Sequence, residues 1–138
     1  MPQTRTVKLD IPCRFEMLDV VQCVLAHFSV LIAFDEEAAH HMSVAVRESV
    51  VNAMKHGSDL DEQKRVQVEF RPDDKGLEIA IRDSGKGFDP ALVPDPLAQE
   101  NLLKAYGRGI FFMRQFMDEV VYSFPPEGGT LVRMVKRS

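Results

Sequence analysis

The chain has 138 residues, of which 17 are basic and 21 acidic, and 45% of its residues are hydrophobic. This length and composition predict a single folded domain over residues 1–138 and argue against intrinsic disorder. The formal net charge of −4 argues against direct binding of nucleic acid, because sequence-independent binding needs a basic face.

The first half of the chain predicts one strand and two helices. Residues 5–10 alternate polar and apolar side chains, as a short strand does. Residues 15–34 form a long apolar run without Gly or Pro, which predicts a helix of three or more turns. Asp35 suits the N-cap of a second helix, which would run to His56 and stop at Gly57. The inward stripe of that second helix comprises Met42, Ala45, Val46, Ser49, Val50 and Ala53.

The second half predicts further strands, one helix and a long irregular segment. Residues 65–71 and 77–82 alternate in period two, with a hairpin turn at residues 73–76 between them. Residues 84–109 are rich in Gly and Pro, and a long irregular segment in a compact domain favours a functional loop. The remaining elements are a helix and two strands, at residues 110–117, 119–124 and 130–135.

This order of elements, β-α-α-β-β-loop-α-β-β, predicts the α+β class. We expect a two-layer α/β sandwich in which a mixed β-sheet is covered by helices on one face. Such a sandwich has one hydrophobic core, between the sheet and the helices.

The cysteines and the apolar segments indicate the compartment. Cys13 and Cys23 do not make a disulfide framework, so we expect a reduced chain. Residues 1–10 contain charges and no apolar block, unlike a signal peptide. The most apolar stretch, residues 20–34, is 15 residues long, whereas a membrane span needs about 20. We therefore predict a cytoplasmic protein without a membrane segment.

A polar stripe runs beside the apolar stripe of the second predicted helix. Glu48 and Asn52 lie one turn apart on it, and Lys55 and His56 continue the row. Glu48 suits removal of a proton from an incoming nucleophile, and Asn52 offers an oxygen to a hard cation such as Mg²⁺. For this segment taken alone, a solvated face without a role is the alternative.

Two glycine motifs follow. Residues 83–88 (DSGKGF) place Asp83 at a strand end before a G-x-G turn. Backbone can come close to a flat ligand there while Asp83 accepts its hydrogen bonds, and a tight turn without a ligand is the alternative. Residues 107–109 (GRG) lead into a helix, whose free N–H groups would cradle an anion. The sequence contains no P-loop, dinucleotide fingerprint or eukaryotic-type kinase motif set.

Together, the three motifs resemble the boxes of the GHKL ATPase superfamily. Residues 48–57 (E-x-x-x-N-A-x-x-H-G) look like its N-box, residues 83–88 like its D-x-G-x-G box, and residues 107–120 like its second glycine box. The N-box form and the ending of residues 117–120 (MDEV) are most similar to the anti-sigma-factor serine/threonine kinases. The resemblance covers roughly residues 7–137 and implies the GHKL, or histidine-kinase-like ATPase, fold.

The resemblance implies a serine/threonine protein kinase that uses ATP and Mg²⁺. Asn52 would coordinate Mg²⁺, Asp83 would accept a hydrogen bond from the adenine amino group, and Glu48 would be the general base on a substrate hydroxyl. The other implied nucleotide-binding residues are His56, Gly85, Gly87, Gly107, Gly109 and Thr130. We add Lys104 and Arg108 as cations that would offset developing phosphoryl charge.

The same resemblance implies the partners. The protein substrate would be a STAS-domain anti-anti-sigma factor, a sigma factor would be a second partner, and the chain would act as a homodimer. Three alternatives stay open: a non-catalytic switch in which ATP sets partner affinity, an ATPase with water as the nucleophile, and a binding module for another ligand. Some members of the family act in signalling circuits without a sigma factor.

Overall fold

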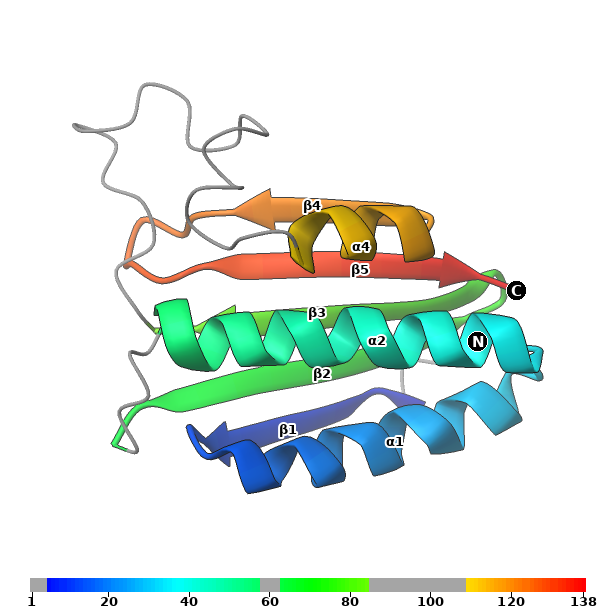
Figure 1. Cartoon of the computed structure of the whole chain (residues 1–138), viewed down its shortest axis with the longest axis horizontal. Coiled ribbons are helices and arrows are strands. Elements are labelled where there is room, and N and C mark those ends of the chain that lie inside the picture. The colour runs from blue at the N-terminus through cyan, green and yellow to red at the C-terminus, as the bar shows by residue number, and fades with distance from the viewer. Residues whose placement is uncertain (1–4, 58–62, 85–108) are drawn as a thin grey trace.

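The computed structural model describes residues 5–57, 63–84 and 109–138. Within these ranges, three α-helices cover one face of a five-stranded sheet, which gives two layers (Figure 1). The predicted α+β class and the position of the helices on one face are confirmed. The predicted glycine-rich segment lies mostly outside the described residues.

The sheet consists of β1 (Val7–Pro12), β2 (Arg65–Asp73), β3 (Gly76–Asp83), β4 (Glu119–Ser123) and β5 (Leu131–Arg137). Their order across the sheet is β1-β2-β3-β5-β4, and every described pair is antiparallel. This pairing differs from the mixed sheet that we predicted. The β4–β5 hairpin inserts β5 between β3 and β4, so these two strands run in the same direction without pairing.

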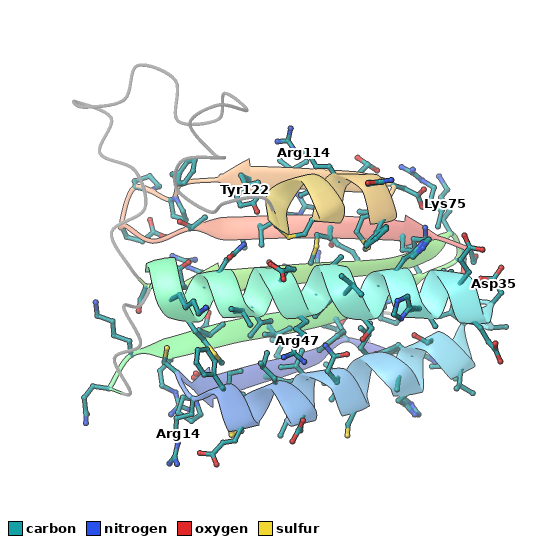
Figure 2. The ribbon with its side chains drawn as sticks, viewed as in Figure 1. Arg14, Asp35, Arg47, Lys75, Arg114 and Tyr122 are labelled. Atoms are coloured by element: carbon teal, nitrogen blue, oxygen red, sulfur yellow. The ribbon has the colours of Figure 1, made fainter. Side chains whose placement is uncertain are left out.

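The helices are α1 (Leu18–Leu31), which follows a 3₁₀ turn, α2 (Glu36–Asn52) and α4 (Gly109–Phe116). Asp35 lies at the start of α2 (Figure 2). It caps this helix as predicted, because its Oδ1 accepts a hydrogen bond from the Ala38 N–H at 2.8 Å. The last turn of the predicted second helix is a π-helical turn, Ala53–Gly57. The local sequence signals therefore locate both ends of this helical segment.

The core lies between the sheet and the helices. All six residues of the predicted inward stripe of the second helix are buried, which confirms the stripe. Fully buried side chains from the two layers meet them, namely Val21, Phe70, Ile79, Met113 and Met134. This packing fixes the position of α2 over the middle of the sheet (Figure 1).

The apolar segment around α1 is longer than the 15 residues that we predicted. Phe15–Ile32 spans 18 residues and is long and apolar enough to cross a membrane by length and composition. The same segment buries four side chains in the core of the sandwich, Leu18, Val21, Leu25 and Phe28. Its apolar character therefore has a role in packing this domain.

Candidate functional site

The candidate site lies where α2 and β3 end and β5 begins. Asn52 is the last residue of α2, Asp83 is the last residue of β3, and Thr130 directly precedes β5. All three line one small cavity and are only 4% to 7% exposed. The structure thus brings together an amide, an acid and a threonine that the sequence placed in three separate segments.

The rest of the cavity wall combines side chains of both layers, namely Ser49, Ala53, Ile81, Tyr122 and Val132. Figure 2 shows Tyr122 on β4, toward the opposite end of the molecule from Asp35. The cavity has a volume of about 10 Å³, which is room for about one water molecule. A larger ligand would therefore reach these groups only if the walls separate.

Hydrogen bonds hold Asp83 against Thr130. The Asp83 N–H donates to the Thr130 carbonyl at 3.0 Å, and the Thr130 N–H donates to Asp83 Oδ1 at 3.2 Å. The backbone of the neighbouring segment therefore orients the carboxylate at the cavity. An ordered carboxylate of this kind accepts hydrogen bonds from a ligand without first losing side-chain freedom.

Gly128 and Gly129 allow this close approach. Their φ angles are +103° and +84°, in the left-handed region that favours glycine. A Cβ atom on Gly129 would lie 2.2 Å from the Asp83 carbonyl oxygen. The glycine pair directly precedes Thr130, and this adjacency is the sequence signal that links the pair to the site.

An ion pair ties the same turn to β3. Arg82 Nη2 lies 2.7 Å from Glu127 Oε1 at the surface, and the hydrogen bond from Arg82 lowers the pKa of the Glu127 carboxyl. Within the turn, the Gly128 N–H donates to the Pro125 carbonyl at 2.9 Å. The exposed ion pair thus links the turn to β3, and the Gly128 hydrogen bond closes the turn just before Thr130.

Two buried polar atoms at the cavity have no hydrogen-bond partner in the described part of the chain. They are Ser49 Oγ and Asn52 Nδ2. Buried polar groups in folded proteins are nearly always hydrogen-bonded, so this pair indicates a place where a ligand or water binds. Ser49 was predicted only as a member of the inward stripe of this helix. The sequence signal for a role at the site was the presence of a hydroxyl within that otherwise apolar stripe.

The Asn52 amide fits a magnesium ion held jointly with a ligand. No group of three or more His, Cys, Asp or Glu side chains within the described ranges could hold a metal alone. Mg²⁺ is commonly bound by few protein oxygens together with water and substrate phosphates. Rotation of the amide by half a turn exchanges Oδ1 and Nδ2, so either atom can face the cavity.

The other predicted site residues have different positions. Glu48 is half-buried on α2, one turn before Asn52, and it is not among the described side chains that line the cavity. His56 lies in the π-helical turn, and Gly109 is the first residue of α4. Five further predicted residues lie outside the described ranges, namely Gly85, Gly87, Lys104, Gly107 and Arg108.

Sequence comparisons agree with the motifs. A family model described as the histidine kinase-like ATPase domain matches residues 12–136. The chain is 24% identical over 120 residues to the serine-protein kinase RsbW of Listeria innocua, covering 83% of this chain and 76% of that protein. It is 35% identical over 98 residues to the anti-sigma F factor of Clostridium botulinum, covering 70% of this chain and 68% of that protein.

A solved structure supports the same fold. The crystal structure of RsbU and RsbW domains from Mycobacterium tuberculosis matches 99% of this chain with a TM-score of 0.67 and 16% sequence identity. This chain spans 33% of that longer chain. The likeness concerns the architecture, a sheet covered by helices on one face.

Proposed function

We propose that this chain is an ATP-dependent serine/threonine protein kinase and anti-sigma factor. The proposal starts from the family: the chain belongs to the histidine kinase-like ATPase family and within it to the anti-sigma-factor kinases. Its substrate would be a STAS-domain anti-anti-sigma factor, and its second partner a sigma factor. The observation that carries the proposal is the convergence of Asn52, Asp83 and Thr130 on one buried cavity in a chain of this family.

Asp83 would recognise the adenine base of the nucleotide. Its carboxylate is buried, and the Thr130 N–H holds one of its oxygens. An ionised carboxylate only accepts hydrogen bonds, so it suits the exocyclic amino group of adenine and disfavours the carbonyl that guanine carries at the same position. This chemistry favours ATP over GTP as the nucleotide.

Asn52 would hold Mg²⁺ on the phosphate groups. An Mg²⁺ ion held there would supply positive charge to offset the negative charge that develops during phosphoryl transfer. The buried amide supplies an oxygen for the ion and, at Nδ2, a donor that is unpaired within the described part of the chain. We propose that four further residues contact the phosphates. The resemblance suggests this for Gly107 and Gly109, and positive charge suggests it for Lys104 and Arg108.

Glu48 would act as the general base. In the transfer, a serine or threonine oxygen of the substrate forms a bond to the γ-phosphorus while the bond from that phosphorus to the β–γ bridging oxygen breaks. ADP leaves, and the hydroxyl proton passes to the Glu48 carboxylate. Glu48 lies on the same helix as Asn52, one turn away, so a single rigid element would position both the base and the metal ligand.

The test is transfer of labelled phosphate from Mg-ATP to a STAS-domain protein. Glu48→Gln is expected to bind ATP like the wild type and to lose transfer, whereas Asp83→Asn is expected to lose ATP affinity. Glu37→Gln, at the exposed start of the same helix, is the matched control and should transfer normally. Unchanged transfer in Glu48→Gln would contradict its role as base.

The fate of the label separates the alternatives. Label released as free phosphate, with none on protein, would indicate an ATPase. Nucleotide binding without any turnover would indicate a switch in which ATP only changes partner affinity. Failure of the wild type to bind ATP would reject the proposed nucleotide site altogether.

We further propose that the chain is a single domain that acts in the cytoplasm as a homodimer. The outer face of α1 supports the homodimer. Val20, Val30 and Leu31 are 39%, 81% and 45% exposed, and Asp19 is the single charged residue in the helix. Pairing of two copies through this face would remove apolar surface from water. Val30→Glu is expected to convert a dimer into a monomer in sedimentation experiments, and a dimer that persists would reject this interface.

A further inference from the structure

Ser49 differs from the other partly or fully buried serines of the helices. Ser29 Oγ donates to the Leu25 carbonyl at 2.9 Å within its own helix, which is the usual bond of a helical serine. Ser43 Oγ donates to Gln22 Oε1 at 2.7 Å. Ser49 is 3% exposed, yet its Oγ has no partner among the residues described. Its hydroxyl therefore contributes no visible bond to the fold.

The position of Ser49 in the cavity wall would allow its hydroxyl to contact a bound ligand. Ser49 comes from the helical layer, whereas Asp83 and Thr130 come from the sheet layer, and all three line the same cavity. A group that enters between the layers would contact Ser49 on one side and Asp83 on the other. The cavity already has room for about one water, and each layer contributes polar side chains to its otherwise mainly apolar wall.

We propose that the Ser49 hydroxyl donates a hydrogen bond to a ring nitrogen of the bound adenine, directly or through one water, and so helps to determine nucleotide specificity. The inference rests on the proposed function, in which Asp83 accepts a hydrogen bond from the adenine amino group. Ring nitrogens N1 and N7 flank that amino group, and both are acceptors. A serine hydroxyl supplies the donor that the Asp83 carboxylate lacks.

The stability of the nucleotide-free protein distinguishes a role of the Ser49 hydroxyl in nucleotide binding from a role in the fold. Removal of a buried hydroxyl that makes no bond does not destabilise the fold, whereas removal of a bonded one does. Ser49→Ala should therefore leave the urea midpoint of the free protein unchanged or raised. Ser29→Ala, the matched control, should lower that midpoint because it removes the bond to Leu25.

The binding test compares ATP, 1-deaza-ATP and 7-deaza-ATP by isothermal titration in the presence of Mg²⁺. Ser49→Ala is expected to weaken ATP binding by about fivefold to tenfold, the effect of one hydrogen bond, and Ser29→Ala by less than about twofold. The wild type should bind one of the two analogues more weakly than ATP. Ser49→Ala should bind that analogue and ATP with nearly equal affinity.

Two results would overturn the inference. One is equal ATP affinity of Ser49→Ala and the wild type. The other is a loss of affinity that leaves the preference for ATP over both analogues unchanged, because the hydroxyl would then act on something other than a ring nitrogen. In both cases ATP still binds the wild type, and the proposed function stands. Absence of ATP binding to the wild type would instead reject both proposals.

Discussion

Asp83 and Thr130 bond to each other in both directions. The Asp83 N–H donates to the Thr130 carbonyl at 3.0 Å, and the Thr130 N–H donates to the Asp83 carboxylate at 3.2 Å. The first bond continues the pairing of β3 with β5, and the second uses that pairing to orient a buried acid. The geometry of the proposed adenine-binding site therefore depends on the turn before β5.

The first prediction concerns Gly129 in that turn. Gly129→Ala is expected to destabilise the protein by about 2 to 4 kcal/mol, because the left-handed φ costs about 1 to 2 kcal/mol and the new methyl overlaps the Asp83 carbonyl oxygen. The same overlap should displace Asp83 and weaken ATP binding. Urea denaturation and nucleotide titration measure the two effects.

Gly76 provides the control for this prediction. It also has a positive φ, and a Cβ there would lie 2.0 Å from the Lys136 carbonyl oxygen at the far end of β3. Gly76→Ala should therefore lower stability while leaving the ATP affinity of the folded protein unchanged. Equal losses of affinity in both variants would mean that the effect on binding is a consequence of general instability.

The second prediction concerns the unpaired amide of Asn52. Asn52→Ala removes a buried polar group whose Nδ2 has no partner among the described residues. The free protein should therefore be as stable as the wild type or more stable, while Mg-ATP binding is lost. Chelation of Mg²⁺ should weaken ATP binding to the wild type and have no further effect on the variant. A lower urea midpoint for the variant would show that Asn52 serves the fold.

Local features of this fold were predictable from the sequence because nearby residues determine them. Asp35 caps α2 through the Ala38 N–H, three residues away. In the predicted hairpin turn, Asp73 Oδ1 accepts hydrogen bonds from the N–H groups of Lys75 and Gly76 at 2.7 and 2.9 Å. Each interaction is complete within a few residues, so residue type and spacing suffice to predict it.

Strand pairing and the cavity wall were less predictable because they depend on distant segments. The position of β5 between β3 and β4 follows from how the last hairpin packs on the sheet, and alternation along a single strand does not encode its neighbours. The motifs led to Asn52 and Asp83. They missed Ser49 and Gly129, whose roles follow from what lies opposite them in space.

The third prediction distinguishes the two cysteines. Cys23 is exposed on α1, whereas Cys13 is 3% exposed and its Sγ donates to the Met54 carbonyl at 3.4 Å. A thiol reagent should therefore label one cysteine per chain in the native protein, and Cys23→Ser should abolish this labelling. Labelling of Cys13 should appear only with unfolding. Rapid labelling of two thiols in the native protein would contradict the burial of Cys13.

The fourth prediction concerns a ring contact that joins α2 to α4. The His41 and Phe116 rings are stacked, with centroids 4.3 Å apart and planes 7° apart. Lys136 Nζ also donates to the Phe116 carbonyl at 2.9 Å, which ties the end of α4 to β5. His41→Ala should lower the free energy of unfolding by about 1 to 2 kcal/mol, because it removes the stacked pair and leaves Phe116 less covered.

His40 is the matched control for this contact, because it is the neighbouring histidine and is exposed. His40→Ala should change the free energy of unfolding by less than about 0.5 kcal/mol. Equal stability losses in the two variants would show that the stacked pair does not stabilise the α2–α4 interface.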